Sequence, residues 1–118
     1  MEKNITVRLT ARLFAEEKCY GPGVEQLLKA VEKHRSLRAA AASMSMAYSK
    51  AWSIIRAAEQ GFGCKLLHST IGGAGGGGAV LTDEARQIMD AYGEYCRRLN
   101  EYGQTLFQEL FGFCAKGE

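Results

Sequence analysis

The stretch STIGGAGGGGAVLT, residues 69–82, decides how the rest of this sequence is interpreted. Six of the 14 glycines in the chain fall between Gly72 and Gly78. Such runs occur in phosphate-binding loops, in flexible linkers between domains, and at the tips of β-hairpins. The residues around the run distinguish among these structures.

A nucleotide-binding loop is disfavoured by the residues that accompany the glycines. Gly72 and Gly77 have the spacing of a Walker loop, but the dipeptide that follows supplies neither its lysine nor its magnesium-binding hydroxyl. The dinucleotide pattern GxGxxG fits Gly73, Gly75 and Gly78. No βαβ pattern surrounds it, and a run this rich in glycine matches by accident.

A hairpin explains the run better than a linker does. A linker needs two domains, whereas 118 residues form one ordinary domain with a core. The segments CKLLHSTI, residues 64–71, and AVLT, residues 79–82, are both typical of short strands. Two strands around a glycine tip predict a β-hairpin, or wing, with glycine where the backbone needs positive φ or close approach.

Three helices are predicted before the wing. The first starts at Pro22 and stops near His34, the second follows Ser36 as N-cap, and the third covers residues 47–60 and ends at the GFG of residues 61–63. We expect the third helix to bury Ala51, Trp52, Ile55 and Ala58 and to expose Ser49, Lys50, Ser53 and Arg56. Together with the wing, this order predicts a winged helix-turn-helix, mainly α with a small β component.

The N-terminal residues alternate between apolar and polar side chains. The apolar positions are Ile5, Val7, Leu9, Ala11 and Leu13, which predicts a half-buried strand over residues 5–13. A turn at residues 16–18 and a short return segment up to the GPG of residues 21–23 would complete an N-terminal hairpin.

A long final helix is predicted from residue 82, with Thr82 as N-cap and acidic residues in its first turn. Its apolar residues recur at heptad spacing, which favours pairing with a second copy, although a helix folded back on its own domain has the same pattern. Gly93 and Gly103 each cost such a helix about 1 kcal/mol relative to alanine, so packing must support it. The predicted dimerisation residues are Ile88, Tyr92, Tyr95, Leu99, Tyr102 and Leu106.

Composition and charge indicate where the protein is located and what kind of partner it binds. Hydrophobic residues make up 47% of the chain, but no apolar run approaches the ~18 residues of a membrane helix, and the N-terminus lacks a signal-peptide pattern. We therefore expect a cytoplasmic protein with no membrane partner. Residues 33–82 contain six basic groups and one acid, Glu59. This excess favours a polyanionic partner over a chance run of solvated charges.

Catalytic and metal-binding patterns are not apparent in the sequence. The four cysteines are far apart, which predicts reduced thiols rather than a metal site. His34 has no second histidine or cysteine nearby in the sequence, and His68 has only Cys64, four positions earlier, which are too few ligands for a metal site. We expect no enzyme activity and no cofactor.

The chain resembles the N-terminal domain of the molybdate-responsive transcriptional regulators of the prokaryotic ModE type, whose winged helix is related to that of LysR-type regulators. The likeness rests on GPG at residues 21–23, AA at 40–41, MAYSKAW at 46–52, and GGAGGGGAVLT at 72–82. It implies a homodimeric transcription factor that binds double-stranded DNA. Full-length relatives carry a further molybdate-binding module, and no molybdate site is expected in this chain.

The resemblance also shows departures. The family often has Lys at the position of Ala74, Arg at that of Ser69, and Gly at that of Arg35. The domains expected from it are a DNA-binding domain over residues 1–81, a dimerisation helix over 82–112 and a tail over 113–118.

The site residues expected to bind DNA lie in the helix-turn-helix and the wing. For base edges we expect Tyr48, Ser49, Lys50 and Ser53, although partial burial beside Trp52 is an alternative role for Tyr48. For phosphates we expect Ser36, Arg38 and Arg56. The wing would contribute Gly72, Gly73, Gly75, Gly76, Gly77 and Gly78. A protein-interaction module that has lost operator binding, and a small-anion site at the glycine amides, are the alternative functions.

Overall fold

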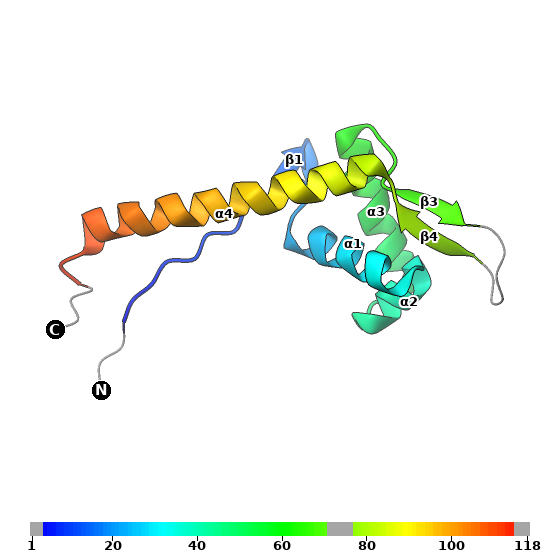
Figure 1. The fold of residues 1–118 in the computed structure, drawn as a ribbon, viewed down its shortest axis with the longest axis horizontal. Coiled ribbons are helices and arrows are strands. Elements are labelled where there is room, and N and C mark those ends of the chain that lie inside the picture. Colours follow the sequence, from blue (N-terminus) through cyan, green and yellow to red (C-terminus); the bar gives the residue numbers. More distant parts are fainter. Residues whose placement is uncertain (1–3, 71–76, 115–118) are drawn as a thin grey trace.

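The computed structural model describes residues 4–70 and 77–114, which form a small domain and one long projecting helix (Figure 1). The molecule measures 61 × 33 × 22 Å because that helix extends well beyond the domain. In chain order the elements are β1 (Leu13–Ala15), β2 (Glu17–Tyr20), α1 (Pro22–His34), α2 (Leu37–Ser43), α3 (Tyr48–Phe62), β3 (Leu67–Thr70), β4 (Gly78–Leu81) and α4 (Asp83–Phe111). This is the predicted winged helix-turn-helix.

The core lies where α1, α2 and α3 meet. Small alanines on α2 and α3 let these helices approach α1 closely, because no long side chain separates the backbones. Tyr20 and Leu66 complete the core from β2 and from the loop after α3. The buried apolar residues of α1, α2 and α3 are Val24, Leu27, Leu28, Val31, Leu37, Ala40, Ala41, Ala51, Ile55 and Ala58.

Helix boundaries follow the capping residues that the sequence predicts. The Ser36 hydroxyl accepts a hydrogen bond of 2.8 Å from the Ala39 amide at the start of α2. The Thr82 hydroxyl accepts one of 3.0 Å from the Ala85 amide at the start of α4. Gly63 ends α3 with a φ of 73°, a left-handed conformation that suits glycine.

The prediction of a strand over residues 5–13 is wrong. Only Leu13–Ala15 forms β1, which pairs with β2 across a turn at Glu16. Residues 4–12 instead run alongside α4 (Figure 1). Their backbone bonds to side chains of that helix, so this segment is held by a helix rather than within a sheet.

Gly103 lies where this N-terminal segment approaches α4. A Cβ built on Gly103 would lie 2.6 Å from Leu9 Cδ1, so the missing side chain makes room for Leu9. The same position that weakens the helix therefore allows the segment to pack on it.

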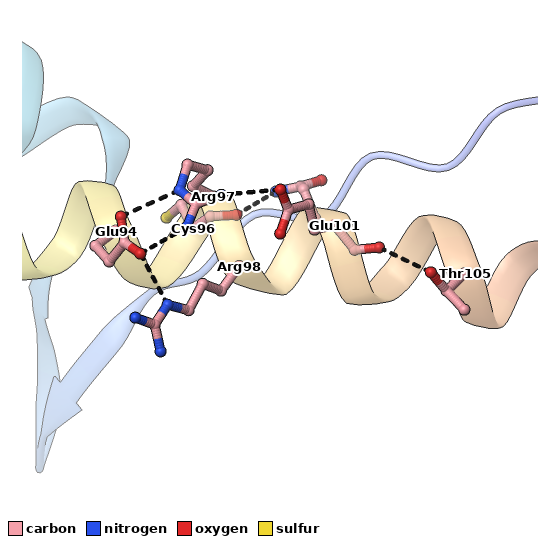
Figure 2. Close-up of polar contacts among 7 residues, drawn as sticks. Glu94, Cys96, Arg97, Arg98, Glu101 and Thr105 are labelled. Atoms are coloured by element: carbon pink, nitrogen blue, oxygen red, sulfur yellow. Dashed lines mark hydrogen bonds and ion pairs between the residues drawn. The ribbon is translucent and has the colours of Figure 1, made fainter.

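Ion pairs cover part of the exposed surface of α4 (Figure 2). Arg97 contacts Glu94 at 2.7 Å and Glu101 at 2.8 Å, and Arg98 contacts Glu94 at 2.8 Å. The hydrogen bonds from Arg97 and then Arg98 lower the pKa of Glu94 to about 2. Pairs at this spacing support a helix, although each contributes little when exposed to solvent.

The apolar residues of α4 divide into two groups. Ile88 is partly buried and Tyr92 is 7% exposed, and both pack on the core of their own domain. Tyr95, Tyr102 and Leu106 are 57%, 69% and 40% exposed. Part of the predicted dimer seam is thus occupied within the chain, and the distal part remains uncovered.

Candidate nucleic-acid interface

The outer face of α3 presents four polar side chains, as predicted. Ser49, Lys50, Ser53 and Arg56 are all exposed. Neither Lys50 nor Arg56 takes part in an ion pair within residues 4–70 and 77–114. The Ser53 hydroxyl donates to the Lys50 carbonyl at 3.0 Å, which leaves its oxygen lone pairs facing outward.

Trp52 does not lie in the core, and its predicted burial is wrong. It is 38% exposed, because Ala51, Ile55 and Ala58 fill the face of α3 that meets α1 and α2. Its indole nitrogen donates to the Tyr48 hydroxyl at 2.9 Å.

Two arginines flank this aromatic pair. The Arg38 guanidinium lies 4.1 Å from the centroid of the Tyr48 ring, and the Arg56 guanidinium lies 6.0 Å from that of Trp52. Tyr48 is half-buried, which agrees with its alternative role, partial burial beside Trp52. Its hydroxyl oxygen accepts from Trp52, so its hydroxyl proton is free to donate.

A groove separates α3 from the wing and brings several of the predicted site residues together. Its volume is about 460 Å³. Trp52, Lys65 and Ser69 also line it, although they are not among the predicted site residues. The spacing of Tyr48 and Trp52, one helical turn apart, is the signal in the sequence that points to Trp52. The predicted site residues in its lining are Ser36, Arg38, Tyr48, Gly77 and Gly78.

The wing is an antiparallel hairpin anchored on the turn between α1 and α2. Its register pairs Leu67 with Leu81 and Thr70 with Gly78. The Ala79 amide donates to the Arg35 carbonyl at 3.0 Å. A Cβ on Gly78 would lie 2.5 Å from Thr70 Oγ1 and 2.9 Å from the Arg35 oxygen, so only glycine fits this contact.

The remaining wing glycines have different positions. Gly77 is exposed, and a Cβ there would meet nothing within 4 Å. Gly72, Gly73, Gly75 and Gly76 lie outside the described residues, so their predicted contacts stay predictions.

Arg35 occupies a backbone conformation that favours glycine. It caps α1 with φ of 64° and ψ of 17°, in the left-handed region. A glycine would adopt this conformation without the strain that a Cβ brings.

No group of three or more metal-binding side chains occurs within the described part of the chain. The described helices also include none that is long and apolar enough to cross a membrane. All four cysteines are free thiols.

Comparisons with known proteins agree with this geometry. Residues 26–86 match the model of the bacterial regulatory helix-turn-helix protein, lysR family. This range extends from α1 through the wing into α4.

Several curated relatives are regulators of the ModE type. The transcriptional regulator ModE of Haemophilus influenzae is 28% identical over 105 residues, which are 89% of this chain and 39% of the relative. The DNA-binding transcriptional dual regulator ModE of Escherichia coli K12 is 32% identical over 88 residues, 75% of this chain and 32% of the relative. The molybdenum transport protein ModE of Herbaspirillum seropedicae is 30% identical over 101 residues, 86% and 34% of the two chains.

The chain thus spans between 32% and 39% of the length of these three relatives. The resemblance read from the GPG, MAYSKAW and wing segments is confirmed, since these alignments cover most of the chain. The chain belongs to the lysR family of bacterial regulatory helix-turn-helix proteins, as a helix-turn-helix domain of the ModE type.

Proposed function

We propose that this chain is the DNA-binding module of a transcriptional regulator and acts on double-stranded DNA as a homodimer. The observation that carries the proposal is the exposed polar row of α3, namely Ser49, Lys50, Ser53 and Arg56, beside a groove shared with the wing. Membership of a regulatory helix-turn-helix family supports it, as does the similarity to a DNA-binding regulator of Escherichia coli.

In this proposal α3 lies in the major groove and reads base edges with its N-terminal half. The Lys50 ammonium donates to guanine O6 and N7. Ser53 acts as an acceptor toward the amino group of adenine or cytosine, because its proton is held by the Lys50 carbonyl. Ser49 has no such internal bond among the described residues and can donate or accept.

Cations around this row bind the phosphates. Arg38 and Arg56 lie at the two ends of the Tyr48–Trp52 pair, and Lys65 lines the groove on the wing side. The Ser36 hydroxyl keeps its proton for a phosphate, because its oxygen accepts from Ala39 within the chain. The glycine amides of the wing would follow the backbone on the flank.

The distal part of α4 supplies the dimer contact. Tyr95, Tyr102 and Leu106 are exposed apolar side chains on a helix that extends beyond its own domain. Covering them with a second copy removes this surface from water, and a two-fold dimer presents two α3 helices to successive major grooves.

Titration of the protein with duplex DNA over a range of salt concentrations tests this function. If a dimer neutralises about six phosphates, log affinity falls with log salt at a slope of roughly −5. A folded dimer that fails to bind duplex DNA even at low salt would contradict the proposal.

That result would favour a protein-interaction module on the same scaffold. The observation in its favour is that the side chain contributed to the groove by position 69 of β3 is the uncharged Ser69. Binding of a partner protein in the absence of DNA would then be the measurement to make.

A further inference from the structure

The N-terminal segment, residues 5–11, is bonded to α4 along one edge only. Asn100 accepts from the Leu9 amide and donates to the Leu9 carbonyl, each at 3.0 Å. Gln104 donates to the Val7 carbonyl at 2.9 Å. The Tyr92 hydroxyl donates to the Ala11 carbonyl at 2.7 Å.

Every one of these backbone groups belongs to an odd-numbered residue. An extended residue directs its N–H and C=O to the same side, and the next residue directs its own to the opposite side. The two bonds from Leu9 to a single carboxamide fit this geometry, since Asn100 pairs with Leu9 as a neighbouring strand would.

The even-numbered residues therefore direct their backbone groups away from α4. Within residues 4–70 and 77–114, the amides and carbonyls of Thr6, Arg8 and Thr10 form no hydrogen bond. The side chains of these residues are exposed as well. The segment thus combines the composition of a strand with one open edge, which is a template for another strand.

We propose that this open edge pairs with the same segment of a second copy, as an antiparallel two-stranded ribbon across the two-fold axis of the dimer. The inference rests on the proposed homodimer and adds a backbone contact to it. An antiparallel pair of identical strands is self-complementary, as a two-fold interface requires. The segment also lies on α4, whose exposed Tyr95, Tyr102 and Leu106 belong to the proposed dimer contact.

The charges of the segment select between possible registers. A two-fold axis through Val7 places Arg8 opposite Thr6 of the second copy, and an axis through Leu9 places it opposite Thr10. An axis through Arg8 would place two guanidinium groups directly opposite each other, which is unfavourable. Both favoured registers use the Thr10 amide as a donor.

Two substitutions at one position test the ribbon. Thr10→Pro removes the N–H that faces the open edge, whereas Thr10→Ala keeps it. The ribbon contains two symmetric Thr10 bonds, so we expect the proline variant to dimerise about 30-fold more weakly than the alanine variant. Sedimentation equilibrium measures the dissociation constant of the dimer for each variant. Unchanged signals of the Asn100 side-chain amide in NMR spectra show that the segment stays on α4. Equal dissociation constants for the two variants would overturn the inference.

Hydrogen exchange in the unmodified protein gives a second test. The Arg8 and Thr10 amides should exchange slowly in the dimer and quickly in dilute monomer. If these two amides exchange in the dimer as fast as in an unstructured peptide, the ribbon is excluded, and the proposed contact between the α4 helices is unaffected. A protein that stays monomeric at all concentrations would overturn the ribbon together with the dimer, while its binding to an isolated half-site tests the DNA-binding role independently.

Discussion

The indole nitrogen of Trp52 donates a hydrogen bond of 2.9 Å to the hydroxyl of Tyr48, one turn earlier in α3. The Arg38 guanidinium lies over the Tyr48 ring, 4.1 Å from its centroid. The two contacts hold Tyr48 in place at the edge of the groove and leave its hydroxyl proton available to a DNA acceptor.

Removing the indole donor should therefore affect DNA binding through Tyr48. We expect Trp52→Phe and Tyr48→Phe each to weaken binding by about 0.5–1.5 kcal/mol, and the double variant to lose little more than one of them. Fluorescence anisotropy with labelled duplex DNA measures the affinities of the wild type, the two single variants and the double variant. Fully additive losses would show that the two side chains act independently.

Two glycines of the helices, one in a crowded position and one in an open position, allow the packing of the domain to be tested by the same substitution. A Cβ on Gly61 would lie 2.6 Å from Cys19 Cβ, whereas one on Gly93 would meet nothing within 4 Å. We expect Gly61→Ala to lower the free energy of unfolding by about 1–3 kcal/mol through overpacking, and Gly93→Ala to raise it by about 1 kcal/mol through helix propensity. Urea denaturation followed by circular dichroism compares them, and a stable Gly61→Ala protein would refute the close contact between α3 and β2.

Arg35 should be replaceable by glycine with a gain in stability. Its φ of 64° is costly for a side chain with a Cβ, so Arg35→Gly should raise the free energy of unfolding by about 1 kcal/mol. Arg35→Ala keeps the Cβ and serves as the control, with little change expected. A thermal midpoint that is no higher for the glycine variant than for the alanine variant would argue against this strain.

The distal row of α4 can be tested without disturbing the domain. Tyr102 is 69% exposed, so Tyr102→Glu should leave the monomer folded. In the dimer it would bury a carboxylate without a partner, and we expect dimerisation to weaken at least about tenfold. Gln108→Glu adds the same charge at another exposed position of α4 and should leave the dimer intact. Equal sedimentation of the two variants would place the interface elsewhere.

Most of the fold could be predicted because it follows local signals. The caps at Ser36 and Thr82, the left-handed Gly63 and the two strands of the wing depend on residues within a few positions of each other. Resemblance to a family added the overall architecture.

The errors concern contacts between distant parts of the chain. An alternating pattern does not indicate whether the backbone of the segment pairs with a strand or with the side chains of Asn100 and Gln104, which lie about ninety positions later. Likewise, heptad spacing could not show that Tyr92 packs on Tyr20, at 5.0 Å between ring centroids, rather than on a second copy. Periodicity predicts Trp52 in the core, yet alanines and Ile55 already fill that face.

Selection of binding sites from random duplexes, for the wild-type protein and two variants, tests the central claim that α3 reads DNA sequence. We expect the wild type to select a two-fold symmetric consensus. Lys50→Ala should lose the preference at one position in each half-site, with a cost of about 1–3 kcal/mol on the preferred sequence. Arg56→Ala should weaken all sequences about equally and keep the consensus, because a phosphate contact carries no base information. A consensus that is unchanged by Lys50→Ala would contradict the placement of α3 in the major groove.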